Sequence, residues 1–400
     1  MVEARHDLTT RQVGQDGFSE PGGGGAPVRA SVPAGMADPA GALAARLGAG
    51  PHALIVLFAG EGAVLPQVLA GLTTRYPRTE ILGCTTAGEI GEDGYAEGHL
   101  VAIAFPASSF AVETVVIDPL SAIDSRRMVA RLQQARLDLS RHADRLRHEL
   151  ALLLVDGVSG EEEFLIASLS GGLGPMPIVG GSAGDGHNFN RTQVFRGERV
   201  HDHAAIVCLI RSKMVMRTFS FDSTMPSRRQ MVVTQADPAR RIILRINDEP
   251  AAAEYARLLD CPPDNLGPEL FATRPVLVRV GGRHFVRAIR DVGPGQSLVF
   301  FGAVAEGMVL TLSAETDIAA HLERALEGLS RDGPPSLILG FDCVFRRIEV
   351  ETRQRVAEVS GLLARHRVAG FSTYGEQING MHLNQTLTGV AFYPDGAGWA

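Results

Sequence analysis

The chain has 400 residues, of which 45% are hydrophobic and 21% are charged, and its formal net charge is −7. This composition is typical of a globular protein with a buried core, and the length predicts two core domains. The negative charge argues against a general nucleic-acid binder or a protein that docks on anionic membranes, because both need a basic face.

The chain also lacks the patterns of secreted and membrane proteins. Its first residues, MVEARHDLTT, do not follow the charged-then-apolar layout of a signal peptide. No apolar run approaches the roughly 18–20 residues of a membrane span. The four cysteines are far apart and form no C-x-x-C pair, which suits a reducing compartment. We therefore expect a cytoplasmic protein.

The N-terminal segment, residues 1–45, contains the stretch QDGFSEPGGGGAPVRASVPAG. It is rich in glycine, proline and serine and has few large apolar residues, so burial cannot offset the entropy lost on ordering. A disordered tail is the prediction here. Two α/β domains should follow, over residues 50–215 and 216–395.

A strand–helix–strand pattern then occurs three times. Each unit opens on a continuous apolar run, as in a strand buried on both faces, and continues with apolar residues at helical spacing. A further strand follows each unit. In the first unit, the expected first strand, helix, second strand and following strand are 53–60, 64–77, 79–89 and 99–106. In the second unit they are 150–157, 161–174, 175–185 and 203–210. In the third unit they are 336–343, 350–367, 368–376 and 385–393.

Other elements lie between these units. Residues 125–150 read as a long arginine-rich helix, and residues 315–329 as an amphipathic helix. Residues 232–314 have a different pattern, with strands, a helix that starts near Pro250, and glycine turns between antiparallel strands. The predicted fold class is therefore α/β, with repeated strand–helix–strand units in mixed sheets, two lobes, and an antiparallel α+β insertion in the second half.

Each unit ends in a turn that combines glycine, a small hydroxyl residue and an acid: GCTTAGE at 83–89, GGSAGD at 180–185 and GFSTYGE at 370–376. Glycine supplies the positive φ of a tight turn, and the acid can accept backbone N–H groups. These turns are either structural corners or the wall of a ligand pocket. The candidate pocket residues are Thr85, Thr86, Glu89, Ser182, Asp185, Ser372, Thr373, Tyr374, Glu376 and Asn384.

No catalytic motif is legible. G-x-S-x-G is missing, GSAGDG does not have the G-x-G-x-x-G spacing, and no cluster has the spacing of metal ligands. We therefore expect a protein that is not an enzyme.

The histidines are more informative, because several stand at equivalent loops. His99, His201, His203 and His382 lie at or just before the strand that follows each unit, and His187 lies within the second turn. Ligands of open α/β sheets bind beyond strand ends. Imidazole is a good ligand for iron, and a haem pocket sets one histidine in an apolar wall. That wall could come from Phe105, Phe189, Phe195, Phe371 and Tyr374.

Four segments resemble landmarks of the FIST family of sensory proteins: LGCTTAGEI, IVGGSAGDG, INDEPAAAEYA and GFSTYGEQINGMHLNQTLTGVAFY. The resemblance covers residues 52 to 393 and implies a FIST N-type domain over 50–215 and a FIST C-type domain over 216–395. FDCVFRRIE, followed by GFSTYGEQ and MHLNQT, is most similar to the nitric-oxide-sensing haemoproteins of this family, the NosP type. Leu383 between His382 and Asn384 departs from the family pattern.

The resemblance implies a signal-transduction sensor without its own output domain. It would bind haem b through one histidine, with His382, His187 and His203 as candidates in that order. Nitric oxide at the iron would weaken the histidine bond and shift the contact between the domains. The partner would be a separate histidine kinase, a cyclic-di-GMP enzyme or a chemotaxis receptor.

The alternative is a haem-free sensor for an amino-acid-like metabolite. In that case the acids of the three turns would bind the amino group, and the N–H groups of the turns would bind the carboxylate.

Overall fold

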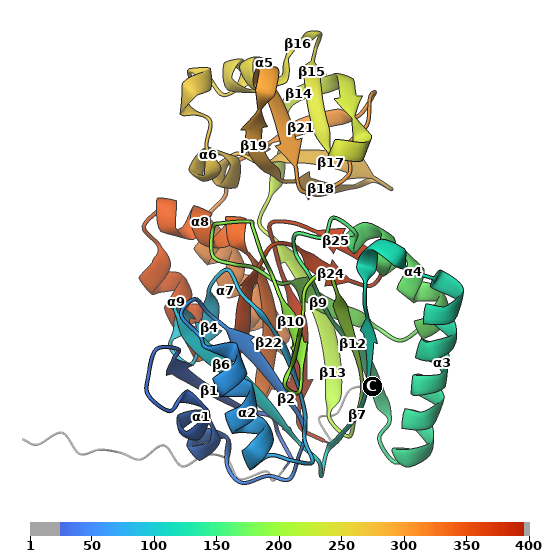
Figure 1. Ribbon diagram of the computed structural model, residues 1–400. Helices are drawn as coiled ribbons and strands as arrows, with labels where there is room; N and C mark the ends of the chain where they lie inside the picture. Colours follow the sequence, from blue (N-terminus) through green and yellow to red (C-terminus); the bar gives the residue numbers. More distant parts are fainter. Residues whose placement is uncertain (1–24, 396–400) are drawn as a thin grey trace, which may run out of the picture.

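The computed structural model describes residues 25–395 (Figure 1). The first part of the predicted tail, up to residue 24, lies outside the described residues. The rest of that prediction is wrong, because β1 (Val28–Pro33) and α1 (Pro39–Leu47) fold within it. Ala30 and Val32 are buried as β1 pairs with β6, and the Asp38 side chain caps α1 by accepting from Gly41 N at 2.8 Å. Together with Ala34, Ala40, Leu43 and Leu47, these two apolar residues are buried in the core of the first sheet, although the segment has few large apolar side chains.

The three predicted units are confirmed. In each unit the first and second strands are parallel neighbours connected by a helical segment, and the following strand pairs antiparallel with the first strand. The elements are β2 (His52–Ala59), α2 (Leu65–Arg75), β3 (Glu80–Thr85) and β6 (His99–Pro106); β8 (His148–Val155), α4 (Glu162–Leu173), β9 (Ile178–Ser182) and β12 (Ala205–Ser212); β22 (Leu337–Cys343), α9 (Val356–Arg365), β23 (Val368–Thr373) and β26 (Thr386–Tyr393).

Two predicted helices have other bounds than expected. The helix predicted for 350–367 is the shorter α9, and a turn at Gln354, whose φ is +56°, separates it from α8 (Val344–Thr352), which begins before the predicted start. The arginine-rich helix ends early, as α3 (Ser125–His142). The amphipathic helix is α7 (Ile318–Leu329), capped by the Asp317 carboxylate.

The units exchange hairpins. Each contributes a short hairpin that pairs with the second strand of another unit: β4 (Glu89–Gly91) and β5 (Gly94–Ala96) extend β23, β10 (Val194–Arg196) and β11 (Arg199–His201) extend β3, and β24 (Glu376–Ile378) and β25 (Met381–Leu383) extend β9. The far edges are β1, β7 (Phe110–Ile117) and β13 (Val215–Asp222). All three sheets therefore have the same six-stranded order, and the chain closes into a ring of three like units.

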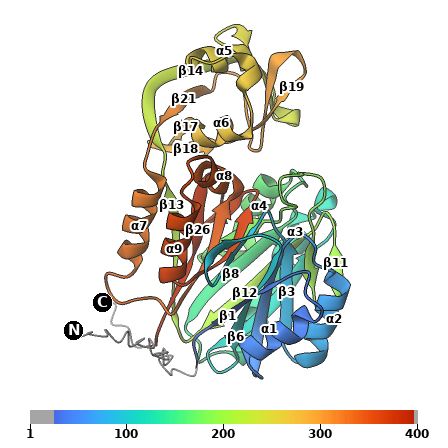
Figure 2. The same ribbon diagram turned by 90° about the vertical axis from the view of Figure 1, so that its left-hand side faces the viewer.

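The helices cover the outside of this ring (Figures 1 and 2). Helices α1 and α2 pack on the first sheet, α3 and α4 on the second, and α7 and α9 on the third. The inner faces of the sheets share one apolar core, in which the ring of Phe58 lies 4.7 Å from Phe371 and 6.5 Å from Phe341. Burial of this core, at about 25 cal/mol per Å² of apolar surface, is what holds the three units together.

Residues 225–314 form a separate body, called the insertion below, which lies at one end of the ring (Figure 1). The chain leaves the ring after β13 and returns before α7. An antiparallel sheet and two helices pack around Tyr255 and Phe271, and this core continues into the ring at α8, through Val344, Phe345 and Ile348. Its elements are β14 (Met225–Asp237), β15 (Ile242–Ile246), β16 (Glu249–Pro250), α5 (Ala251–Leu258), α6 (Pro268–Thr273), β17 (Val276–Val280), β18 (Arg283–Arg287), β19 (Ile289–Gly293), β20 (Ser297–Phe300) and β21 (Val309–Ala314).

Candidate functional site

The three glycine turns meet at the centre of the ring. Equivalent backbone hydrogen bonds link each turn to the next, so that the set closes on itself: Ala87 N donates to Ser372 O at 2.9 Å, Tyr374 N to Ser182 O at 3.3 Å, and Gly184 N to Thr85 O at 3.0 Å. The repeated motif thus lies where the three units join.

The first glycine of each motif has a structural cause. An ideal Cβ on Gly83, Gly180 or Gly370 would lie only 1.8, 1.9 or 1.7 Å from the carbonyl oxygen of the facing strand residue. Real Cβ atoms do not approach an oxygen so closely. Each second strand can therefore approach its first strand only with glycine at this position.

The acids of two turns are buried, and their carboxyl groups accept hydrogen bonds that hold nearby backbone in place. Glu89 and Glu376 are fully buried. A carboxylate oxygen of Glu89 accepts from His99 N at 2.9 Å, and one of Glu376 accepts from Thr386 N at 3.1 Å and from its hydroxyl at 2.8 Å. In the second unit Asp156, which the motif does not contain, accepts from His203 N at 2.6 Å. Each acid fixes the start of the strand that follows its own unit.

The other turn candidates are buried or hydrogen-bonded within the protein, and among them the Ser372 hydroxyl is buried without a hydrogen-bond partner. Ser182, Ser372 and Thr373 are buried, and half-buried Asp185 accepts from the Tyr374 hydroxyl and two loop N–H groups. The remaining contacts are Thr86 Oγ1 to Glu89, Gln193 N to Thr85 Oγ1, and Asn384 Nδ2 to Tyr374 O. The turns thus fill the centre of the ring. The cavities described below lie away from this centre.

We expect the Glu376 carboxyl to make stability pH-dependent. Burial raises its pKa well above the ordinary value, against the opposing effect of the Thr386 bonds, and one carboxyl oxygen has no hydrogen-bond partner. A raised folded-state pKa gives stability that is full below the unfolded pKa and is lost as the pH rises through the folded pKa. The urea midpoint of the unsubstituted protein, measured relative to that of Glu376→Gln, should decrease as the pH is raised from 5 to 8. If the midpoints of the two proteins change with pH in the same way, the prediction is contradicted. Glu61→Gln, which changes a surface carboxylate, is the control.

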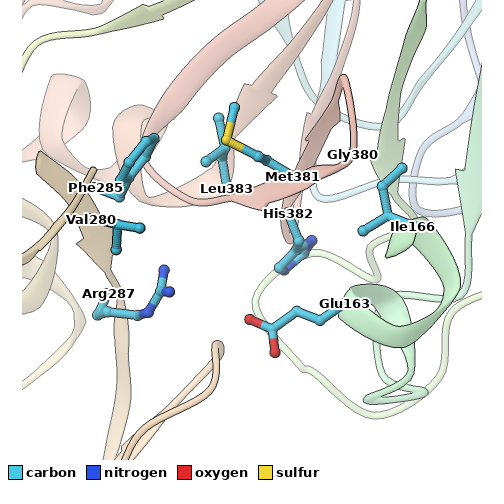
Figure 3. A pocket seen from close by; sticks show the side chains of 9 residues that line it. All are labelled: Glu163, Ile166, Val280, Phe285, Arg287, Gly380, Met381, His382 and Leu383. Carbon is cyan, nitrogen blue, oxygen red and sulfur yellow. The ribbon is translucent and has the colours of Figure 1, made fainter. Parts of the chain in front are cut away.

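The three candidate histidines lie in different places. His187 is exposed and lines a cavity of about 290 Å³ beside the first turn. The His203 side chain is 69% exposed, with Nδ1 3.8 Å from Asp156. His382, on β25, is half-buried and lines a cavity of about 220 Å³ between the ring and the insertion (Figure 3). Of the three, only His382 has largely apolar surroundings.

The His382 cavity takes its walls from both bodies. The ring contributes Glu163 and Ile166 of α4 and the Gly380–Leu383 end of the exchanged hairpin, and the insertion contributes Val280, Phe285 and Arg287 (Figure 3). Alternation along β18 places Phe285 and Arg287 on one face of the strand. The cavity is therefore an apolar space into which three polar side chains project.

The polar side chains of His382, Arg287 and Glu163 differ in charge. Burial lowers the pKa of His382 to about 4, so the imidazole is neutral near pH 7; Gln377 Nε2 lies 3.2 Å from its Nδ1. Burial also lowers the pKa of Arg287, with Glu163 opposing, and Arg287 Nε is buried without a hydrogen-bond partner. Within the described part of the chain no ion pair joins Arg287 to Glu163. A cation, a carboxylate and a neutral imidazole thus face one space.

Between residues 25 and 395 no group of three or more His, Cys, Asp or Glu side chains could hold a metal ion. In the same range no helix is long and apolar enough to cross a membrane.

Two family models match most of the chain. Residues 53–249 match the FIST N domain and residues 251–379 match the FIST C domain. No curated protein matches. A crystal structure of chorismatase is similar over 92% of this chain and 98% of its own, with 11% sequence identity and a TM-score of 0.34. The two domain matches cover most of the chain, which therefore belongs to the FIST family of signal-transduction sensor domains.

Proposed function

We propose that this protein senses an amino-acid-like metabolite, which binds between the ring and the insertion at Arg287, Glu163 and His382. The observation that supports this most is Arg287 Nε, a buried donor without a partner at a cavity that also presents a carboxylate. An unsatisfied buried donor costs about 1–3 kcal/mol and calls for an acceptor that is missing from the apo protein.

Each part of an apolar amino acid has a counterpart in the cavity. Arg287 can take the carboxylate through two parallel N–H bonds, and Glu163 can take the ammonium group. The side chain would lie against Ile166, Phe285 and Met381. Neutral His382 adds a hydrogen-bonding group without a charge. The volume of about 220 Å³ suits a small ligand.

Binding there would act on the contact between the two bodies. Arg287 belongs to the insertion and Glu163 to the ring, so a ligand held by both favours the arrangement in which they are close. Such coupling is typically about 1–3 kcal/mol. The partner that reads the arrangement would be a separate histidine kinase, cyclic-di-GMP enzyme or chemotaxis receptor.

A thermal-shift series tests this proposal. L-leucine and L-methionine should raise the melting temperature, because a ligand that binds only the folded state stabilises it. N-acetyl-leucine and leucine amide should fail, since each removes one of the two charges that the site would bind. Equal shifts with the blocked forms, or no shift with either free amino acid, would contradict the proposal.

One observation favours haem b as the ligand instead, because His382 is a neutral imidazole in an apolar wall. The space does not fit it: the cavity of about 220 Å³ is below the roughly 300–1,000 Å³ of pockets for drug-sized ligands, and a haem is a large macrocycle. The ring of His382 also lies against Gly375, where a Cβ would come within 2.2 Å of Cε1. Absorption spectra with haem, before and after nitric oxide, test this candidate. A Soret band lost in His382→Ala and kept in His187→Ala and His203→Ala would support it.

A further inference from the structure

A second cavity, of about 370 Å³, lies between the ring and the insertion at the start of α4. Its ring side is the loop Gly157–Glu162 together with Phe189. Its insertion side carries Arg240, Arg241, Arg290 and Phe301. Its volume falls within the roughly 300–1,000 Å³ of ligand pockets. None of these residues lines the His382 cavity.

Glu162 is the first observation that points to a ligand. Its side chain is 6% exposed, it lines the cavity, and its Oε2 has no hydrogen-bond partner. Arg241 Nη2 lies 3.7 Å from this oxygen, too far for a hydrogen bond. A buried carboxyl oxygen in this position calls for a donor from outside the chain.

The positive charge of the cavity is the second observation. Arg241 is held in place, since Nη2 donates to Gly160 O at 2.6 Å and Nη1 donates to Phe301 O. Within residues 25–395, the guanidinium groups of Arg240 and Arg290 have no hydrogen-bond or ion-pair partner, and both residues are exposed. The start of α4 carries the carboxylates of Glu161, Glu162 and Glu163, which offset its attraction for an anion, so the positive charge of the cavity comes from the arginines alone. Two free guanidinium groups are suited to a phosphate.

The aromatic wall is the third observation. Phe189 stacks on Tyr374 with ring centroids 4.3 Å apart, and its centroid lies 5.3 Å from that of Phe301. Phe189 holds a positive φ of 52°, which is rare for a bulky residue. Tyr374 supports this loop, because its hydroxyl accepts from Phe189 N at 3.3 Å. The loop thus presents apolar aromatic surface to the same cavity as the arginines.

From these features we propose that this cavity is a nucleoside monophosphate site. Arg240 and Arg290 bind the phosphate. The base packs against the aromatic wall and donates an N–H to Glu162 Oε2. The site is independent of the amino-acid proposal, so either can fail without the other.

Calorimetric titration of the full chain with AMP and GMP tests the site, with inorganic phosphate and the matching nucleoside as partial ligands. At least one nucleotide should bind one-to-one and at least tenfold more tightly than either partial ligand. Arg290→Ala should weaken it at least tenfold, whereas Arg279→Ala, an exposed arginine of β17, should not. L-leucine should not displace it.

The contact with the base has its own readout. Purine riboside 5′-monophosphate lacks the exocyclic amine of AMP, so the unsubstituted protein should bind it several-fold more weakly than AMP. In Glu162→Gln the difference in affinity between these two nucleotides should be smaller. The proposal is overturned if neither nucleotide binds, or if inorganic phosphate or the matching nucleoside binds as tightly as the nucleotide that does bind. It is also overturned if Arg290→Ala binds normally while its melting temperature is unchanged.

Discussion

Gly370→Ala is expected to lower the free energy of unfolding by at least about 3 kcal/mol, at the upper end of overpacking effects. The new methyl group would lie 1.7 Å from the carbonyl oxygen of Gly340, its partner on the parallel strand β22. A backbone oxygen in a central strand cannot move aside without breaking the ladder. Since β23 also carries the exchanged hairpin β4–β5, the damage should reach the contact between two units. Urea unfolding followed by far-UV circular dichroism measures it.

Gly361→Ala is the matched control. Gly361 lies inside α9, and a Cβ there would have nothing within 4 Å. Alanine favours the helix over glycine by about 1 kcal/mol, so this variant should be as stable as the unsubstituted protein or more stable. Equal unfolding midpoints for the two alanine variants would show that the close strand approach is not what requires Gly370.

Asp342→Ala is the second change for which we expect a large effect, about 3–5 kcal/mol. Asp342 and Arg346 are 1% and 2% exposed and form an ion pair of 2.7 Å. The Tyr95 hydroxyl also donates to Asp342, and Arg346 Nη1 donates to Ser223 Oγ at 3.2 Å. Removing the carboxylate leaves a buried guanidinium without its counter-charge. The loss is large because the partner charge remains in the core.

The effect should also weaken the exchange between units, since Tyr95 comes from the hairpin of the first unit and Asp342 from β22 of the third. Glu92→Gln removes the Arg46–Glu92 pair at 2.9 Å, whose side chains are 54% and 40% exposed. Solvent screens that pair, so its loss should barely move the thermal midpoint. If Asp342→Ala lowers the thermal midpoint as little as Glu92→Gln does, the buried ion pair does not have the expected effect.

Local patterns predicted the three units, since continuous apolar runs, helical spacing and glycine turns are written within short windows. The hairpin exchange could not be predicted in this way. Residues 89–96, for example, form two three-residue strands, and nothing in so short a polar stretch specifies that the partner is β23, almost 300 residues away. Long-range pairing of this kind depends on the closed ring as a whole.

The candidate site was predicted in part. His382 was predicted as a haem ligand, and this role stays a prediction. Glu89 and Glu376 are buried and hydrogen-bonded within the protein, whereas Asp185 is half-buried. Asp156 was missed, although it directly follows the last residue of the apolar strand β8. Arg287 was missed because it belongs to the insertion, which sequence alone does not place against β25. Its signal is the alternation in HFVRAIR, which sets Phe285 and Arg287 on one strand face.

The most direct test of the central claim is calorimetric titration of L-leucine into the unsubstituted protein, Arg287→Met and Arg279→Met. The claim that Arg287 holds a ligand between the two bodies predicts one-to-one binding that Arg287→Met abolishes and Arg279→Met retains. Leucine binding of unchanged affinity and stoichiometry in Arg287→Met would contradict it.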